Sequence, residues 1–147
     1  MHVSVGEILK AKGSDVVTIS GDASVADAVA KLRDAEIGAV VVTTDGDKVE
    51  GVLSERDVVG ALADHGADAL DRKVKDLMSR RVATCSPEDG VEKVMQEMTQ
   101  LRARHFPVVE DGRLVGIVTI GDVVKNRLDE VQLETNVLRD NYIAGRQ

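Results

Sequence analysis

Aromatic residues are almost missing from this sequence, which contains one phenylalanine, Phe106, one tyrosine, Tyr142, and no tryptophan. The core must therefore be aliphatic, and the base-stacking platform typical of single-strand nucleic-acid binders is excluded. Positive charge is in deficit too, because 19 Lys and Arg residues stand against 26 Asp and Glu, a formal net charge of -7. Such a chain repels nucleic acid and anionic membranes overall, so an anionic ligand would need a local basic cluster.

Cysteine and long apolar stretches are scarce as well. With one cysteine, Cys85, no disulfide can form within the chain, which suits a reducing compartment. No run of about 18 apolar residues is present, so no membrane-spanning helix is predicted. The first residues, "MHVSVGEILKAKG", lack the apolar segment of a signal peptide. We therefore expect a cytoplasmic protein that has neither nucleic acid nor a membrane as its partner.

Catalytic and metal-binding motifs are also missing. The sequence contains no G-x-G-x-x-G, G-x-x-x-x-G-K-[ST], G-x-S-x-G or H-E-x-x-H. The stretch from Asp45 begins like a calcium loop, but Glu50 stands where glycine is needed and Arg56 where a bidentate acid is needed. We therefore predict no catalytic residue, no metal site and no enzymatic activity.

What the sequence does contain is an internal repeat. Three pairs of segments align in the same order: residues 5–9 with 74–78, 17–46 with 83–112, and 51–59 with 116–124. The last pair reads "GVLSERDVV" and "GIVTIGDVV", which share a glycine, a Ser or Thr, and an Asp-Val-Val ending. Each repeat unit therefore begins before its first strand and ends in a shared motif.

Both copies predict the same order of elements. A short strand, at residues 16–19 and 82–85, leads to a helix whose apolar residues recur at helical spacing. Ser24 is placed to cap the first of these helices, with Asp27 at its third position. A β-rich run, an Asp-Gly hairpin turn and a second strand follow in each copy.

A last helix is expected to start near Glu55 in the first copy and near Ile120 in the second, giving β-α-β-β-α twice. One such unit buries too little apolar surface to be stable alone. We predict an α/β (α+β) fold in which two repeats pack about a pseudo-two-fold axis, with a C-terminal helical extension. The expected boundaries are residues 5–63 for the first domain, 64–73 for a linker, 74–128 for the second domain and 129–147 for the helical tail.

The doubled unit resembles a known family. The stretches "RHFPVVEDGRLVGIVTIGDVVK" and "GVLSERDVV", together with the β-α-β-β-α order, resemble the cystathionine β-synthase (CBS) domain. Two such domains in tandem form a Bateman module. The resemblance implies a regulatory module, often homodimeric, that binds an adenine nucleotide such as AMP, ATP or NAD(H) in clefts between the paired domains.

The doubled Ser/Thr-x-x-Asp motif provides the central binding candidates. The residue types leave two compatible interpretations open. One is a helix cap with Asp in place of Glu; the other is a helix start that receives phosphate beside a carboxylate that accepts ribose hydroxyls. The resemblance implies that Asp57 and Asp122 hold ribose in separate clefts, and that Ser54 and Thr119 lie near phosphate.

A basic pair just before the β-rich run adds further candidates. Arg104 and His105 match the family position that reaches phosphate across the pseudo-axis, where the first copy has Gly38 and Ala39. The two clefts are therefore not expected to be equivalent. The resemblance further suggests Arg56 near phosphate and, bordering adenine or ribose, Thr18 and Thr84. Solvated charges and ordinary strand threonines are the alternatives at these positions.

Two functions remain open from the sequence. The first is a nucleotide sensor that acts, through a conformational change, on a separate and unidentified effector protein. The alternative is a structural or protein-interaction module without a small-molecule ligand. In that case the two Ser/Thr-x-x-Asp motifs serve only to cap their helices.

The C-terminal stretch carries apolar positions spaced alternately four and three apart, as on one face of a long helix. These positions are Val124, Leu128, Val131, Thr135, Leu138 and Tyr142. The helix either folds on its own domain or contributes to a homodimer contact.

Overall fold

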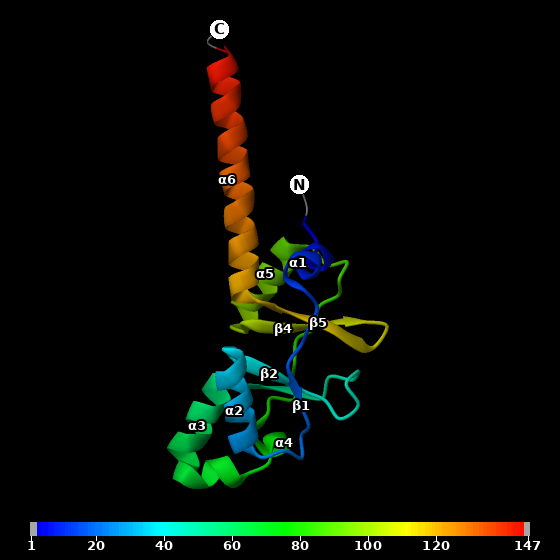
Figure 1. The fold of residues 1–147 in the computed structure, drawn as a ribbon, viewed down its shortest axis with the longest axis vertical. Helices are drawn as coiled ribbons and strands as arrows, with labels where there is room; N and C mark the ends of the chain where they lie inside the picture. Colours follow the sequence, from blue (N-terminus) through cyan, green and yellow to red (C-terminus); the bar gives the residue numbers. More distant parts are fainter. Residues whose placement is uncertain (1–2, 146–147) are drawn as a thin grey trace.

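The computed structural model describes the backbone of residues 3–145 and the side chains as far as Arg139. The chain forms two stacked halves and a long terminal helix (Figure 1). Its elements are α1 (Val5–Lys12), β1 (Thr18–Ile19), α2 (Val25–Ala35), β2 (Ala39–Val42), β3 (Gly51–Ser54), α3 (Glu55–His65), the 3-10 helix η1 (Gly66–Asp71), α4 (Val74–Leu77), α5 (Val91–Leu101), β4 (His105–Glu110), β5 (Arg113–Thr119) and α6 (Ile120–Gly145). The predicted α/β repeat is confirmed, and α3 and α6 start at the residues expected from the sequence.

The first half contains a three-stranded sheet in the order β1-β2-β3, in which β1 runs parallel to β2 and β3 antiparallel to it. Ser24 caps α2 as predicted, because its hydroxyl accepts a hydrogen bond from the N–H of Asp27 at 3.1 Å. The segment expected to be a linker is itself folded: η1 follows α3 directly, and Ala69 is fully buried.

The second half departs from the prediction at its first strand. The strand expected at residues 82–85 is reduced to a single bridge between Cys85 and Val108. In the first half, the N–H of Val41 donates to the carbonyl of Val17. The residue that matches Val41 in the repeat is Pro107, which has no N–H to donate. This half therefore pairs only β4 with β5, through a two-residue Asp111-Gly112 turn with positive φ at both positions.

The two halves exchange their opening helices. Helix α1 packs into the second core, where Val5, Ile8 and Leu9 join Phe106 and other buried residues of that half. Conversely, Val74 of α4 is buried in the first core. Figure 1 shows α1 beside α5 and β5, away from the strands that follow it in the chain. Because each half completes the core of the other, the two are expected to unfold together.

The repeated glycine of the shared motif makes this exchange possible. A Cβ atom at Gly51 would lie 2.6 Å from the Met78 sulfur and 2.7 Å from the Ser79 carbonyl oxygen. A Cβ atom at Gly116 would lie 2.8 Å from two methyl groups of Leu9. Each glycine thus leaves room for the segment that crosses from the other repeat unit.

Gly51→Ala is expected to reduce the free energy of unfolding by about 1–3 kcal/mol, because the backbone carbonyl of Ser79 cannot rotate away from an added methyl group. Gly116→Ala should cost less, since the flexible Leu9 side chain can yield. Gly60→Ala is the control: Gly60 lies inside α3 with open space around it, so the change should stabilise by about 0.5–1 kcal/mol. Urea unfolding of the three variants measures this order, and equal stability of Gly51→Ala and wild type would contradict it.

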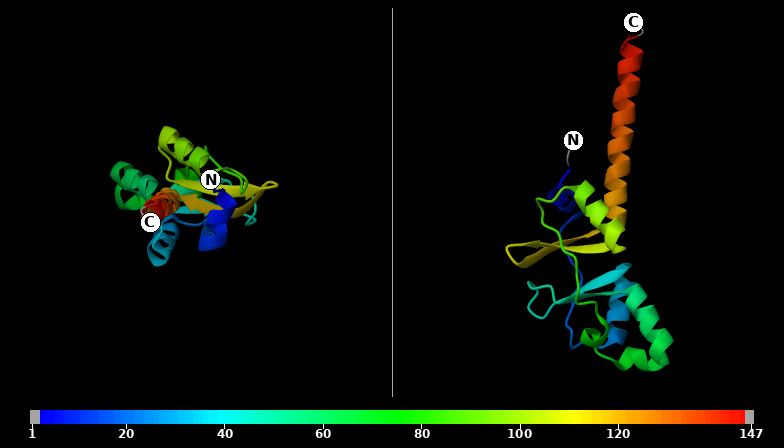
Figure 2. Two further views of the ribbon diagram at one scale, coloured as in Figure 1. Left: turned by 90° about the horizontal axis from the view of Figure 1, so that it is seen from above. Right: turned by 180° about the vertical axis from the view of Figure 1, so that it is seen from behind.

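Helix α6 leaves the body after its first turns and projects from it (Figures 1 and 2). Val123 is fully buried, whereas the apolar residues farther along are exposed, from Val131 at 46% to Leu138 at 69%. Tyr142, the last of the positions predicted on one face of this helix, lies outside the described side chains. Among residues 3–145, none of the helices combines the length and apolar character that crossing a bilayer requires.

Candidate functional site

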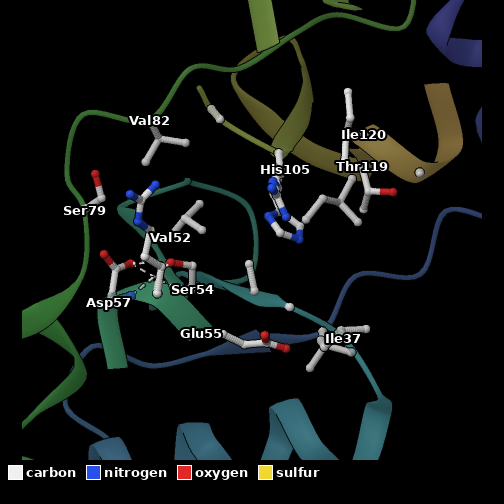
Figure 3. Close-up of a pocket in the computed structure, with 18 of the residues that line it drawn as sticks. Ile37, Val52, Ser54, Glu55, Asp57, Ser79, Val82, His105, Thr119 and Ile120 are labelled. Carbon is white, nitrogen blue, oxygen red and sulfur yellow. Dashed lines mark hydrogen bonds between the residues drawn. The ribbon is translucent and has the colours of Figure 1, made fainter. Parts of the chain in front are cut away.

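A cleft of about 1050 Å³ lies between the two halves and is lined by residues from both. Figure 3 shows Ser54 and Asp57 at one end, Thr119 and Ile120 at the other, and His105 between them. Apolar side chains from both halves form part of the wall, among them Ile37, Val52, Val82 and Ile117. The cleft therefore combines apolar surface with two copies of the hydroxyl motif.

The charge of the cleft differs from that of the whole chain. Its lining contains the basic residues Lys12, Arg56, Arg81, Arg102 and Arg104 and the acidic residues Asp15, Glu36, Glu55 and Asp57. Five basic residues thus face four acidic ones, in a chain with a net charge of -7. The lining therefore has a small excess of positive charge and repels an anionic ligand less than the chain as a whole does.

The first motif sits where β3 turns into α3. The backbone N–H of Ser54 and its hydroxyl donate to Oδ2 of Asp57 at 2.9 and 3.0 Å, and the N–H of Asp57 donates to the Ser54 hydroxyl at 3.2 Å. This is a capping box with Asp at the third helical position. The cap uses only Oδ2, so Oδ1 of Asp57 has no hydrogen-bond partner among the described residues.

The second motif repeats this arrangement where β5 turns into α6. The N–H of Thr119 donates to Oδ2 of Asp122 at 2.9 Å, and the N–H of Asp122 donates to the Thr119 hydroxyl at 3.2 Å. Here a third group is present, because the Lys12 ammonium donates to the same Oδ2 at 2.6 Å. Partial burial on its own would raise the pKa of Asp122, but Lys12 and the Thr119 amide outweigh burial and lower it.

Two matched backbone hydrogen bonds, one in each half, border the cleft. The N–H of Glu55 donates to the carbonyl of Gly38, and the N–H of Ile120 donates to the carbonyl of Arg104, both at 2.9 Å. A Cβ atom on Gly38 would lie 3.2 Å from Nε2 of His105, so the imidazole occupies space that the first half leaves free. Figure 3 shows His105 pointing from β4 into the cleft.

The environment of His105 favours its neutral form. Burial lowers the pKa of His105 and the nearby Arg104 lowers it further, whereas the carboxylate of Glu55 acts in the opposite direction. At neutral pH the ring therefore offers one N–H donor and one acceptor nitrogen to the cleft.

The cleft brings together six of the residues singled out from the sequence: Ser54, Arg56, Asp57, Arg104, His105 and Thr119. It does not bring in Asp122, Thr18 or Thr84, although the residues next to these threonines, Val17 and Ala83, do line it. The carbonyl of Thr18 accepts a hydrogen bond from Lys31 at 2.7 Å.

Lys12 is a lining residue that sequence reasoning missed. It belongs to the first repeat unit along the chain, yet it bonds to an acid 110 residues away in the second half. Its position in the last turn of an amphipathic helix can be predicted from the sequence. That this helix packs on the other half cannot be predicted from the helix alone.

The single cysteine is poorly placed for nucleophilic attack or metal binding. Cys85 is buried, and burial raises the pKa of its thiol to about 12, with Asp89 adding to the effect. The thiolate needed for attack or metal binding is therefore scarce at neutral pH. Within the described part of the chain, His, Cys, Asp and Glu residues form no group of three or more arranged to hold a metal ion.

The comparison with known proteins agrees with the fold. The CBS domain family model matches residues 5–64 and 74–129. The chain is 33% identical to the CBS domain-containing protein CBSX3, mitochondrial, of Arabidopsis thaliana, over 97% of this chain and 72% of that protein. The crystal structure of the CBS-domain containing protein ATU1752 from Agrobacterium tumefaciens is 44% identical and superposes with a TM-score of 0.81, covering 84% of this chain and 92% of the other.

A third similar structure carries bound ligands. The CBS domain pair of protein MJ0100, in complex with 5'-methylthioadenosine and S-adenosyl-L-methionine, is 26% identical, with a TM-score of 0.75 over 84% of this chain and 98% of that one. The family match covers both repeats and most of the chain. This protein belongs to the CBS domain family and carries two CBS domains in tandem.

Proposed function

We propose that the protein is a regulatory module, rather than an enzyme, that binds an adenine nucleotide in the cleft and acts on a separate effector protein. The observation that carries the proposal is the first motif, in which a helix N-terminus, the Ser54 hydroxyl and a free Asp57 oxygen face a cleft rich in arginine. A helix N-terminus favours phosphate, and an ionised carboxylate accepts hydrogen bonds from ribose hydroxyls.

The rest of the cleft matches the other parts of a nucleotide. The apolar wall, which includes Val52 and Val82, suits a purine ring. Arg56 and Arg104 provide charge for phosphate, and neutral His105 adds a donor. Thr18 and Thr84, whose neighbours line the cleft, would border the base through their backbone. The adenine-containing ligands of the similar MJ0100 pair support this class of ligand.

We further propose that the preferred ligand is a nucleotide such as AMP, ATP or NAD(H), and that the module is a homodimer. The exposed apolar face of α6 supports the homodimer. Binding can change the effector only if the nucleotide has different affinities for two conformations of the module. The cytoplasmic location expected from the sequence stays a prediction.

A thermal-shift screen tests this function. AMP, ADP, ATP, NAD+ and NADH are each added to the full chain, with adenosine and inorganic phosphate as controls for the two parts of the ligand. A nucleotide at about 100 times its dissociation constant should stabilise by about 2.7 kcal/mol, a rise in Tm of roughly 5–10 °C. No shift with any of the five nucleotides would reject the sensor and favour the interaction module.

A further inference from the structure

The two copies of the acidic motif differ in one contact. Asp57 and Asp122 accept the same backbone hydrogen bond from the Ser or Thr three residues earlier, at 2.9 Å in both cases. Only Asp122 also bonds to a cation, Lys12, at 2.6 Å. Among the described residues, Asp57 forms no ion pair, so only one of the two carboxylates is free.

The position of Lys12 is set by the fold. Lys12 is the last residue of α1, and the buried residues Val5, Ile8 and Leu9 anchor that helix in the second core. The helix ends at once, because Gly13 has a φ of 99° and donates its N–H to the carbonyl of Leu9 at 2.8 Å. The backbone of Lys12 is therefore held in place, and its side chain extends from there to Asp122.

The Lys12–Asp122 pair lies at the surface, with both side chains partly covered by the protein. The exposed fraction of the side chain is 30% for Lys12 and 23% for Asp122, so solvent screens this pair less than it screens a fully exposed one. Lys12 lines the cleft together with Thr119, whereas Asp122 does not. Lys12 therefore lies between the cleft and the carboxylate that would hold ribose in the second half.

We propose that Lys12 keeps Asp122 closed to ribose, so that the chain takes one nucleotide, at the Ser54–Asp57 end, although it carries the motif twice. This inference rests on the proposed function and names the residue that limits the number of sites. The cleft volume of about 1050 Å³ lies near the upper end of the roughly 300–1000 Å³ usual for one small molecule, so volume alone does not set the number of nucleotides bound. A ribose at Asp122 would have to break the 2.6 Å bond to Lys12 and leave the ammonium group without its carboxylate partner.

Isothermal titration of the full chain with AMP tests the inference through the number of molecules bound, which is independent of affinity. The wild type should bind one AMP per chain, and Lys12→Met, which keeps the apolar stem but removes the charge, should bind two. Lys12→Arg keeps a cation and should bind one. Lys10→Met, on the same helix and without a partner among the described residues, is the matched control and should also bind one.

The double variant Lys12→Met, Asp122→Asn should return to one AMP per chain, because the freed carboxylate is lost again. Two AMP molecules on the wild type, or one on Lys12→Met, would overturn the inference while leaving the proposed function intact. Weaker AMP binding by Lys12→Met at unchanged stoichiometry would also overturn it, by making Lys12 a phosphate ligand. No AMP bound by any of these chains would reject the AMP-binding function and this inference with it.

Discussion

Asp57→Ala is expected to raise the dissociation constant of AMP by about 10- to 150-fold. The substitution removes the free Oδ1 of Asp57, and hydrogen bonds to a charged acceptor are worth on the order of 1.5–3 kcal/mol. It also removes the reciprocal half of the capping box, in which Oδ2 accepts from the N–H of Ser54. Isothermal titration with AMP, at a temperature well below the Tm of the variant, measures the loss of affinity.

Two further variants separate ribose binding from helix capping. Asp57→Asn keeps an amide oxygen that can accept from Ser54, so its unliganded stability should stay near that of wild type while its affinity falls. Asp27→Ala is the matched control, since Asp27 is also the third residue of a Ser-capped helix but lies outside the cleft. If Asp57→Ala binds AMP as tightly as Asp27→Ala does, Asp57 has no part in binding.

Much of the local structure follows from the sequence. The repeated Ser/Thr-x-x-Asp predicts where α3 and α6 begin, because this spacing lets a side chain and a backbone N–H cap each other. The Asp111-Gly112 pair predicts the β4–β5 turn, which needs positive φ at two successive residues. In both cases the signal lies within a few residues of the structure that it specifies.

The crossing of α1 and α4 could not be predicted in this way. The apolar spacing of Val5, Ile8 and Leu9 shows that the helix buries one face, but not which of two similar cores receives it. The glycines of the shared motif do carry this information, since Gly116 leaves room for Leu9, but that is visible only when the two residues are seen together. The bond between Lys12 and Asp122 depends on this crossing. The sequence therefore could not show that Asp122 already has a cationic partner.

Local chemistry also explains the strand that is missing. Residues 82–85 have the composition of a strand, yet their partner strand carries Pro107 where a donor is required. A single-sequence pattern judges each segment by its own residues, whereas a strand needs a partner with matching N–H groups. The alignment of Val41 with Pro107 within the repeat contains the explanation.

Replacing Leu128 and Leu138 together by aspartate is expected to raise the dissociation constant of the homodimer by at least about 100-fold. The two side chains are 63% and 69% exposed within one chain, so most of their surface is available to a second copy. Full burial of a leucine is worth roughly 1.5–3 kcal/mol, and a symmetric contact counts each residue twice. Because both residues are exposed in the monomer, the substitutions should leave the two cores intact.

The opposite face of the same helix provides the control for this dimer contact. Leu133→Asp changes a leucine of similar exposure, at 56%, that does not belong to the predicted face of Leu128, Val131 and Leu138. Light scattering over a dilution series measures the assembly. A monomeric wild type rejects the homodimer. If Leu133→Asp raises the dissociation constant of the dimer as much as the double variant does, the apolar content of α6, rather than this face, holds the two copies together.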